Sequence, residues 1–99
     1  MLINKEANGN ELTVALDGRL DTTTAPQLES ELSNSLNDVK TLVIDMKKLV
    51  YISSAGLRVL LKTQKTMNKQ GTMTVKNISQ EIQDIFEVTG FDEILNIEK

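Results

Sequence analysis

The sequence of 99 residues contains no histidine and no cysteine. Their absence excludes Ser-His-Asp and Cys-His nucleophiles, thiolate zinc sites, disulfides and the usual haem ligands. A magnesium or calcium site built from carboxylates alone is not excluded, but no acidic loop has the spacing of an EF-hand. We therefore expect a protein that is not an enzyme and that holds no cofactor and no metal of its own.

Aromatic residues and long apolar runs are scarce as well. The three aromatic residues are Tyr51, Phe86 and Phe91, and 11 Lys+Arg against 14 Asp+Glu give a net charge of −3. A domain that binds nucleic acid typically has a basic face and aromatic side chains for base stacking, so nucleic acid is not an expected partner. The apolar runs are too short for a membrane-spanning helix or a signal peptide. These features predict an acidic, cytoplasmic protein without membrane insertion.

The length and composition indicate one compact domain spanning residues 1–99. Folding of a chain this long buries roughly 65% of the unfolded chain's surface, which is enough for one hydrophobic core. Hydrophobic residues make up 39% of the sequence, and no internal repeat or linker interrupts it.

Hydrophobic periodicity predicts a hairpin followed by a helix. Asn8-Gly9 is a typical hairpin turn, and the alternation of apolar and polar residues over 11–18 predicts a strand with one buried side. Residues 24–37 have helical periodicity, with Thr24 and Gln27 at the spacing of a capping box.

The rest of the chain alternates strands and helices. The continuous apolar run at residues 41–46 predicts a central strand covered on both faces, between the strands that contain Val14 and Val75. It is followed by a helix opened by Ser53 or Ser54, a strand at residues 72–78, a helix capped by Ser79 and a short strand at residues 95–97. This alternation implies parallel pairing through right-handed crossovers, and therefore an α/β fold with four or five strands in a mixed sheet.

The most distinctive motif lies where the central strand gives way to the next helix: Tyr51-Ile52-Ser53-Ser54-Ala55-Gly56-Leu57-Arg58. Backbone N–H groups at a helix N-terminus lack intrahelical partners and carry partial positive charge, so a phosphate is stabilised there without a basic side chain. Gly56 has poor helix propensity, which indicates that the backbone closely approaches another part of the molecule. Spacing alone favours a structural role, with one serine as N-cap and Gly56 as a packing residue.

Two stretches of the chain resemble the motifs of one known family. Leu16-Asp17-Gly18-Arg19-Leu20-Asp21, followed by Thr24-Ala25, is similar to the turn after that family's second strand. Ile44-Asp45, leading through Tyr51-Ile52 to Ser53-Ser54-Ala55-Gly56-Leu57, is similar to its phosphorylation loop. Over essentially its whole length the chain resembles the STAS family of sulfate-transporter and anti-sigma-factor-antagonist domains. More narrowly, it resembles the free-standing bacterial anti-sigma factor antagonists.

The resemblance implies a STAS-like mixed sheet with crossover helices packed against it, and a protein switched by phosphorylation. In this family an anti-sigma factor that is itself a serine kinase phosphorylates a serine two residues before the motif's glycine, which is Ser54 here. Ser53 is a second candidate acceptor, since it stands where the family usually has an acidic residue. The residues expected to bind the partner are Asp21, Thr22, Thr23, Ser53, Ser54, Ala55, Gly56, Leu57 and Arg58.

The same resemblance implies the partners. The unphosphorylated protein would sequester the anti-sigma factor serine kinase and so release a sigma factor. A metal-dependent serine phosphatase would regenerate this state, and ATP and magnesium would belong to the kinase. Asp21 and Ser54 are expected on one exposed face at the same end of the sheet, where open α/β sheets usually place their sites.

Alternatives stay open at this stage. The same switch or scaffold could serve a lipid-transport complex or a signalling assembly. A nucleotide-binding or hydrolytic α/β domain is a different class, but no G-x-x-x-x-G-K-[ST] or G-x-G-x-x-G run supports it. Asp21 is either a simple cap or a partner contact, and Arg19 and Arg58 are either solvated or bind a phosphate or carboxylate.

Overall fold

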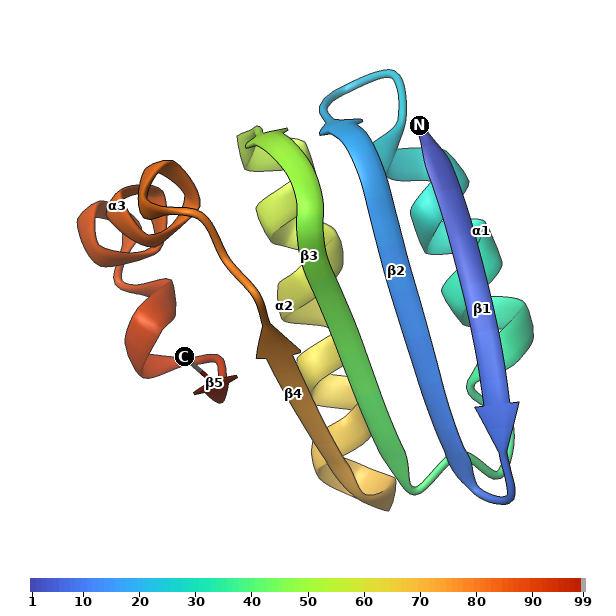
Figure 1. Cartoon of the computed structure of the whole chain (residues 1–99). Coiled ribbons are helices and arrows are strands. Elements are labelled where there is room, and N and C mark those ends of the chain that lie inside the picture. The colour runs from blue at the N-terminus through green and yellow to red at the C-terminus, as the bar shows by residue number, and fades with distance from the viewer. Residues whose placement is uncertain (99) are drawn as a thin grey trace.

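The computed structural model describes residues 1–98, which form a five-stranded sheet and the helices packed on it (Figure 1). The strands lie in the order β1-β2-β3-β4-β5; β1 and β2 pair antiparallel, and every other neighbouring pair is parallel. The elements are β1 (Leu2–Asn8), β2 (Glu11–Leu20), α1 (Ala25–Ser35), β3 (Thr41–Ile52), α2 (Ser54–Gln70), β4 (Thr72–Lys76), α3 (Gln80–Thr89), the 3-10 helix η1 (Phe91–Glu93) and β5 (Ile97–Glu98). The predicted mixed α/β sheet is confirmed.

The hairpin between β1 and β2 is present, but its turn lies one residue later than Asn8-Gly9. Asn8 pairs with Glu11, so the two turn residues are Gly9 and Asn10. Gly9 has φ of 64°, a left-handed conformation that glycine adopts without steric cost. The asparagine of the predicted turn pair therefore belongs to β1.

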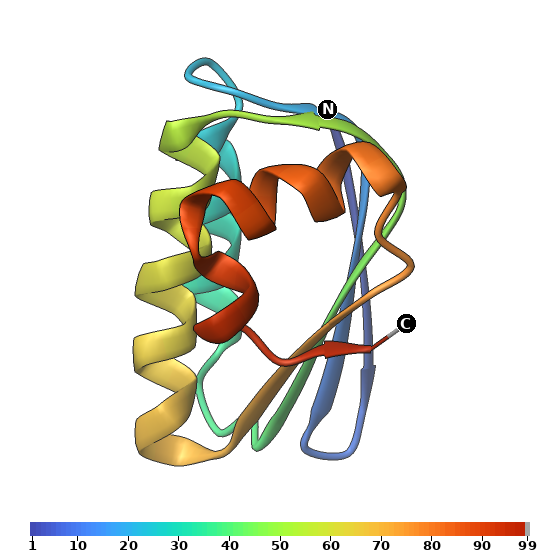
Figure 2. The ribbon, with the colours of Figure 1, turned by 90° about the vertical axis from the view of Figure 1, so that its left-hand side faces the viewer.

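All three helices lie on the same side of the sheet, and the opposite face is bare (Figure 2). Leu42 and Ile44 face the helices and are fully buried, whereas Val43 between them points to the bare face and is only half-buried. The expectation that residues 41–46 are covered on both faces is therefore wrong. The central position is as predicted, because Ile44 pairs with Val14 on one side and with Val75 on the other.

The hydrophobic core fills the space between the sheet and the helices. The strands contribute alternate apolar side chains, and each helix contributes one stripe. The fully buried large side chains are Leu16, Leu20, Leu28, Leu32, Leu42, Ile44, Met46, Leu60, Met67, Met73, Ile82 and Phe86.

The two ends of the sheet differ in how they are built. At the end where the parallel strands begin, the Lys40 amide donates to the Asn10 carbonyl at 2.8 Å, and the Thr72 amide donates to the Lys40 carbonyl at 2.8 Å. Gly71 lies so close to this junction that a Cβ on it would sit 1.9 Å from the Lys40 carbonyl oxygen. The strand starts are therefore joined backbone to backbone, with no room for a side chain.

Candidate docking site

The opposite end of the sheet brings together the two segments predicted to bind a partner. Parallel strands β2 and β3 finish side by side, with Leu20 opposite Ile52, and the Ser53 amide donates to the Leu20 carbonyl at 2.9 Å. The loop that begins at Asp21 and the start of α2 at Ser54 therefore emerge next to each other. The expected placement of Asp21 and Ser54 at one end of the sheet is confirmed.

The two serines at the start of α2 have different surroundings. Ser53 is the N-cap, with extended backbone, and its Oγ accepts a hydrogen bond from the Gly56 amide at 3.4 Å. Ser54 is the first helical residue, and its side chain is exposed, whereas Ser53 is half-buried. The Ser54 hydroxyl thus stands in solvent at the partially positive end of a 17-residue helix.

Gly56 allows this first turn of α2 to pack directly on the strand ends. A Cβ at this position would lie 2.7 Å from Cγ of Leu20 and 2.9 Å from Cγ1 of Ile52. Both distances are shorter than real Cβ contacts, so no side chain fits without displacement. The close approach inferred from the glycine is confirmed, and its partners are the last residues of β2 and β3.

The Asp21 loop is organised by its own carboxylate. Oδ1 of Asp21 accepts hydrogen bonds from the Thr23 hydroxyl at 2.7 Å, the Thr23 amide at 3.0 Å and the Thr24 amide at 3.1 Å. The hydrogen bond from the Thr23 hydroxyl is the main reason why the pKa of this carboxyl is below its ordinary value. Desolvation opposes it, and the amides of Thr24 and Thr23 lower the pKa further. Asp21 therefore caps the loop that leads into α1, and any contact with a partner stays a prediction.

The capping box expected from Thr24 and Gln27 is absent. Thr24 Oγ1 donates instead to the Arg19 carbonyl at 2.8 Å and accepts from the Asp21 amide at 2.8 Å. Because the hydroxyl is directed back into the loop, it does not reach the amides of the first helical turn. The loop is closed by Asp21 and Thr24 together.

An aromatic–cation pair lies beside this loop, and sequence reasoning did not find it. The Arg19 guanidinium stacks over the Tyr51 ring, 4.4 Å from its centroid, and Arg19 Nε lies 3.8 Å from Oδ2 of Asp21. The Arg19 side chain is 60% exposed and lies beside the Asp21 carboxylate, and a contact of Arg19 with a phosphate or with a partner stays a prediction. The pairing of Arg19 with Tyr51 follows two register irregularities between β2 and β3. The second lies at Gly18, which has φ of 114°, and an isolated glycine inside a strand is the signal that could have indicated it.

The remaining predicted residues divide by exposure. Thr22, Thr23 and Arg58 are exposed and Ala55 is half-buried, whereas Leu57 is 5% exposed and packs in the core. A groove of about 330 Å³ between α1 and α2, named here the interhelix groove, is lined by Thr22, Ala25, Pro26, Glu29, Ala55, Arg58, Val59 and Lys62. The fold therefore gathers Thr22, Ala55 and Arg58 on one surface, while Gly56 and Leu57 position the helix beneath it.

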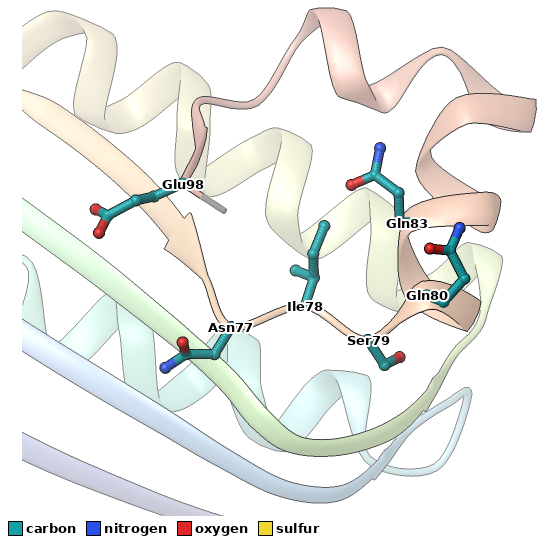
Figure 3. Close-up of a pocket in the computed structure, with 6 residues that line it drawn as sticks. All are labelled: Asn77, Ile78, Ser79, Gln80, Gln83 and Glu98. Carbon is teal, nitrogen blue, oxygen red and sulfur yellow. The ribbon is translucent and has the colours of Figure 1, made fainter.

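A second hollow of about 370 Å³ lies between the segment after β4, α3 and β5 (Figure 3). It is lined by Asn77, Ile78, Ser79, Gln80, Gln83 and Glu98. Its only hydroxyl, that of Ser79, accepts a hydrogen bond from the Ile82 amide as the N-cap of α3. None of the predicted docking residues lines this hollow.

The described residues, 1–98, also bear on metal sites and membrane spans. No group of three or more carboxylate side chains in this part of the chain is placed to hold a metal ion. No helix among the same residues combines the length and the apolar composition needed to cross a membrane.

Comparison with protein families decides the classification. The family model described as STAS domain matches residues 3–99. The chain belongs to the STAS domain family. Its mixed sheet and three helices are the fold of that family's solved members.

Two of its relatives bear the name anti-sigma factor antagonist. The chain is 35% identical over 82 residues to the putative anti-sigma factor antagonist BtrV of Bordetella bronchiseptica, covering 81% of this chain and 71% of that protein. It is 30% identical over 96 residues to the anti-sigma-B factor antagonist of Bacillus subtilis, covering 96% of this chain and 88% of that protein.

The fold is shared with the anti-sigma factor antagonist SpoIIAA of Bacillus, which has been solved in two forms. The unphosphorylated form superimposes with a TM-score of 0.78 and the phosphorylated form with 0.76, each at 18% identity and over 99% of this chain. The match covers 88% and 92% of the respective SpoIIAA chains.

Proposed function

We propose that this STAS domain protein is a cytoplasmic anti-sigma factor antagonist switched by phosphorylation of Ser54. In its unphosphorylated state it binds an anti-sigma factor serine kinase through the Asp21 loop and the start of α2, and the bound kinase releases its sigma factor. Phosphate on Ser54 ends this binding, and a serine phosphatase restores it. The protein itself performs no catalysis.

The observation that carries the proposal is the exposed Ser54 hydroxyl beside the Asp21 loop. A kinase must reach the acceptor oxygen, and Ser54 stands in solvent while Ser53 is half-buried and serves the Gly56 amide as a cap. This difference favours Ser54 over Ser53 as the acceptor. The names of the relatives and the existence of a phosphorylated form of SpoIIAA support a phosphorylation-switched antagonist, and they do not distinguish the two serines.

Electrostatics explains how a phosphate would switch binding without refolding the protein. Phosphoserine carries a charge of about −1.5 to −2 at neutral pH. In the free protein the N-terminus of α2 stabilises this charge by roughly 0.3–1 kcal/mol. Against a docked partner the phosphate is desolvated, and an uncompensated buried charge costs on the order of 3–5 kcal/mol. At about 1.4 kcal/mol per decade, binding weakens by two to four orders of magnitude.

The test has two stages. The immobilised protein is first exposed to a lysate of its source organism, and the captured proteins are identified by mass spectrometry. The captured kinase is then purified and incubated with Mg-ATP and the wild type, Ser54→Ala or Ser53→Ala, and phosphate incorporation is measured. We expect incorporation into the wild type and Ser53→Ala, and none into Ser54→Ala.

The other outcomes are equally informative. Loss of incorporation in Ser53→Ala alone would move the acceptor to Ser53. Recovery of transporter subunits in place of a kinase would replace the proposal by a regulatory role in a transport complex. Incorporation that neither substitution changes would remove the switch altogether.

A further inference from the structure

Helix α2 has a charge composition unlike the rest of the chain. Its 17 residues include four cationic side chains, Arg58, Lys62, Lys65 and Lys69, and no Asp or Glu. The whole chain holds 14 Asp+Glu and has a net charge of −3. Positive charge is therefore concentrated on one element of an otherwise acidic protein.

The four cations lie on one stripe along α2. Their spacings of four, three and four residues place them within about 60° of one another around a helix with 100° per residue. All four are exposed, and the helix stands at the outer side of the molecule (Figure 2). We name these residues the basic stripe; it extends over roughly 17 Å at 1.5 Å per residue.

This stripe continues from the candidate docking site. Ser54 precedes Arg58 by four residues, so its side chain lies at the head of the same stripe. The interhelix groove contains Thr22 and Ala55 and shares Arg58 and Lys62 with a second groove of about 370 Å³. The second groove continues along α2 and is lined by Arg58, Leu61, Lys62, Lys65, Thr66 and Lys69. A partner bound over Ser54 would therefore also cover the basic stripe of α2.

The basic stripe is unfavourable in the free protein. Like charges four residues apart on a helix repel, as do Arg58 with Lys62 and Lys65 with Lys69. Within residues 1–98, Lys62 alone of the four has an acidic partner, Glu29 Oε1 at 2.8 Å. Among residues 1–98, no carboxylate lies within 4.0 Å of Arg58, Lys65 or Lys69. An acidic surface laid along α2 would remove this repulsion.

We propose that the basic stripe of α2 binds an acidic surface of the same kinase that docks at Ser54, and that it accelerates and orients the encounter. This inference rests on the proposed function. The kinase is favoured over nucleic acid or an anionic membrane, because the stripe continues from the surface on which we propose that the kinase docks, so a kinase seated there already faces the cations. An extended polyanion would also meet the field of a protein with net charge −3.

The test compares two charge reversals of equal size. Lys65→Glu/Lys69→Glu alters the basic stripe, and Lys47→Glu/Lys48→Glu alters two exposed lysines of β3 that line neither groove on α2. Both variants are checked by circular dichroism, and their association with the purified kinase is followed by stopped-flow fluorescence at low and high salt. We expect the stripe variant to associate about tenfold or more slowly at about 50 mM salt, and the difference to shrink at about 500 mM, because charges at an interface rim act through screened steering. The β3 variant should associate like the wild type.

Three other results would each contradict the role of the basic stripe, the proposed function or the nature of the partner. If the kinase binds the wild type and both variants at equal rates, the basic stripe has no role, while the proposed function stands. If no kinase binds the wild type, the proposed function and this inference both fall. If the wild type binds a short DNA duplex or vesicles containing phosphatidylglycerol and the stripe variant does not, the stripe serves a polyanion and the protein partner is wrong.

Discussion

The backbone amide of Ser53 donates a hydrogen bond of 2.9 Å to the carbonyl oxygen of Leu20, 33 residues earlier in the chain. This bond continues the parallel pairing of β2 and β3 one residue beyond Ile52. The Asp21 loop and the first turn of α2 therefore cannot separate without breaking it. The candidate docking site is therefore built on two strand ends that are joined beneath it.

Gly56→Ala should lower the stability of the fold and alter this surface. The added methyl group would meet Leu20 Cγ and Ile52 Cγ1, and overpacking of this kind costs about 1–3 kcal/mol. Urea denaturation measures the loss, and amide NMR shifts should change at Leu20 and Ser53. A matched control is Ser54→Ala, an exposed change two residues away on the same helix. Equal stability of Gly56→Ala and the wild type would contradict the packing role.

The two serines should differ in their contribution to stability. Ser53→Ala removes the N-cap and should reduce the free energy of unfolding by about 0.5–1 kcal/mol, at the lower end for such caps because its bond is long. The exposed side chain of Ser54 makes no hydrogen bond within residues 1–98. Ser54→Ala should therefore change the free energy of unfolding by less than about 0.5 kcal/mol. Urea titration of both variants tests the assignment of Ser53 as the N-cap. A larger loss of stability in Ser54→Ala than in Ser53→Ala would contradict it.

Ser54→Asp should separate folding from binding. The carboxylate stands at the N-terminus of α2, where negative charge is favourable, so the variant should melt within a few degrees of the wild type. Its affinity for the kinase should fall by about two orders of magnitude or more, since the charge is desolvated at the interface. Calorimetric titration and a thermal melt measure the two effects. A variant that binds the kinase as the wild type does would exclude an electrostatic switch.

The Asp21 loop should loosen in acid. The pKa of Asp21 is lowered in the folded protein, first by the Thr23 hydroxyl, so the carboxylate stabilises the loop above its unfolded pKa and loses this contribution as the pH falls through the folded value. The expected window therefore lies below about pH 4. Thr23→Val removes the hydroxyl and should raise the pKa of Asp21, as followed by carboxyl carbon shifts in an NMR titration. An unchanged titration would show that the backbone amides suffice.

Much of this fold follows from periodicity that is visible in the sequence. The alternation of Leu12, Val14 and Leu16 gave the face of β2, and the apolar run around Ile44 gave the central strand. The bare face of the sheet was missed because Val43 is as apolar as its neighbours. The alternation of apolar and polar residues in β2 and β4 did indicate the bare face. Both strands neighbour β3 in the same sheet, so the face that is polar in them is also the exposed face of β3.

Other details depend on tertiary contacts that no local pattern encodes. Thr24 is spaced for a capping box, yet its hydroxyl bonds to Arg19 because the loop folds back on itself. Asn77 directly follows β4 with φ of 60°, and its side chain donates to Asp45 on the neighbouring strand at 3.0 Å. The serine pair at the docking end was recognisable as a motif. The inequality of Ser53 and Ser54 became visible only with the burial of each side chain.

The end of the sheet at which the parallel strands begin also bears on how such a protein can change in evolution. Gly71 leaves no space beside Lys40, and the strand starts are bonded directly to one another. Insertions or larger side chains there would displace the strand starts, so this end fixes the register in which the parallel strands pair. Among the described residues, Thr22 and the exposed cations of α2 have no such backbone junction beside them. Descendants of one ancestor can therefore acquire different partners at the end of the sheet that carries Ser54, while the opposite end keeps the fold unchanged.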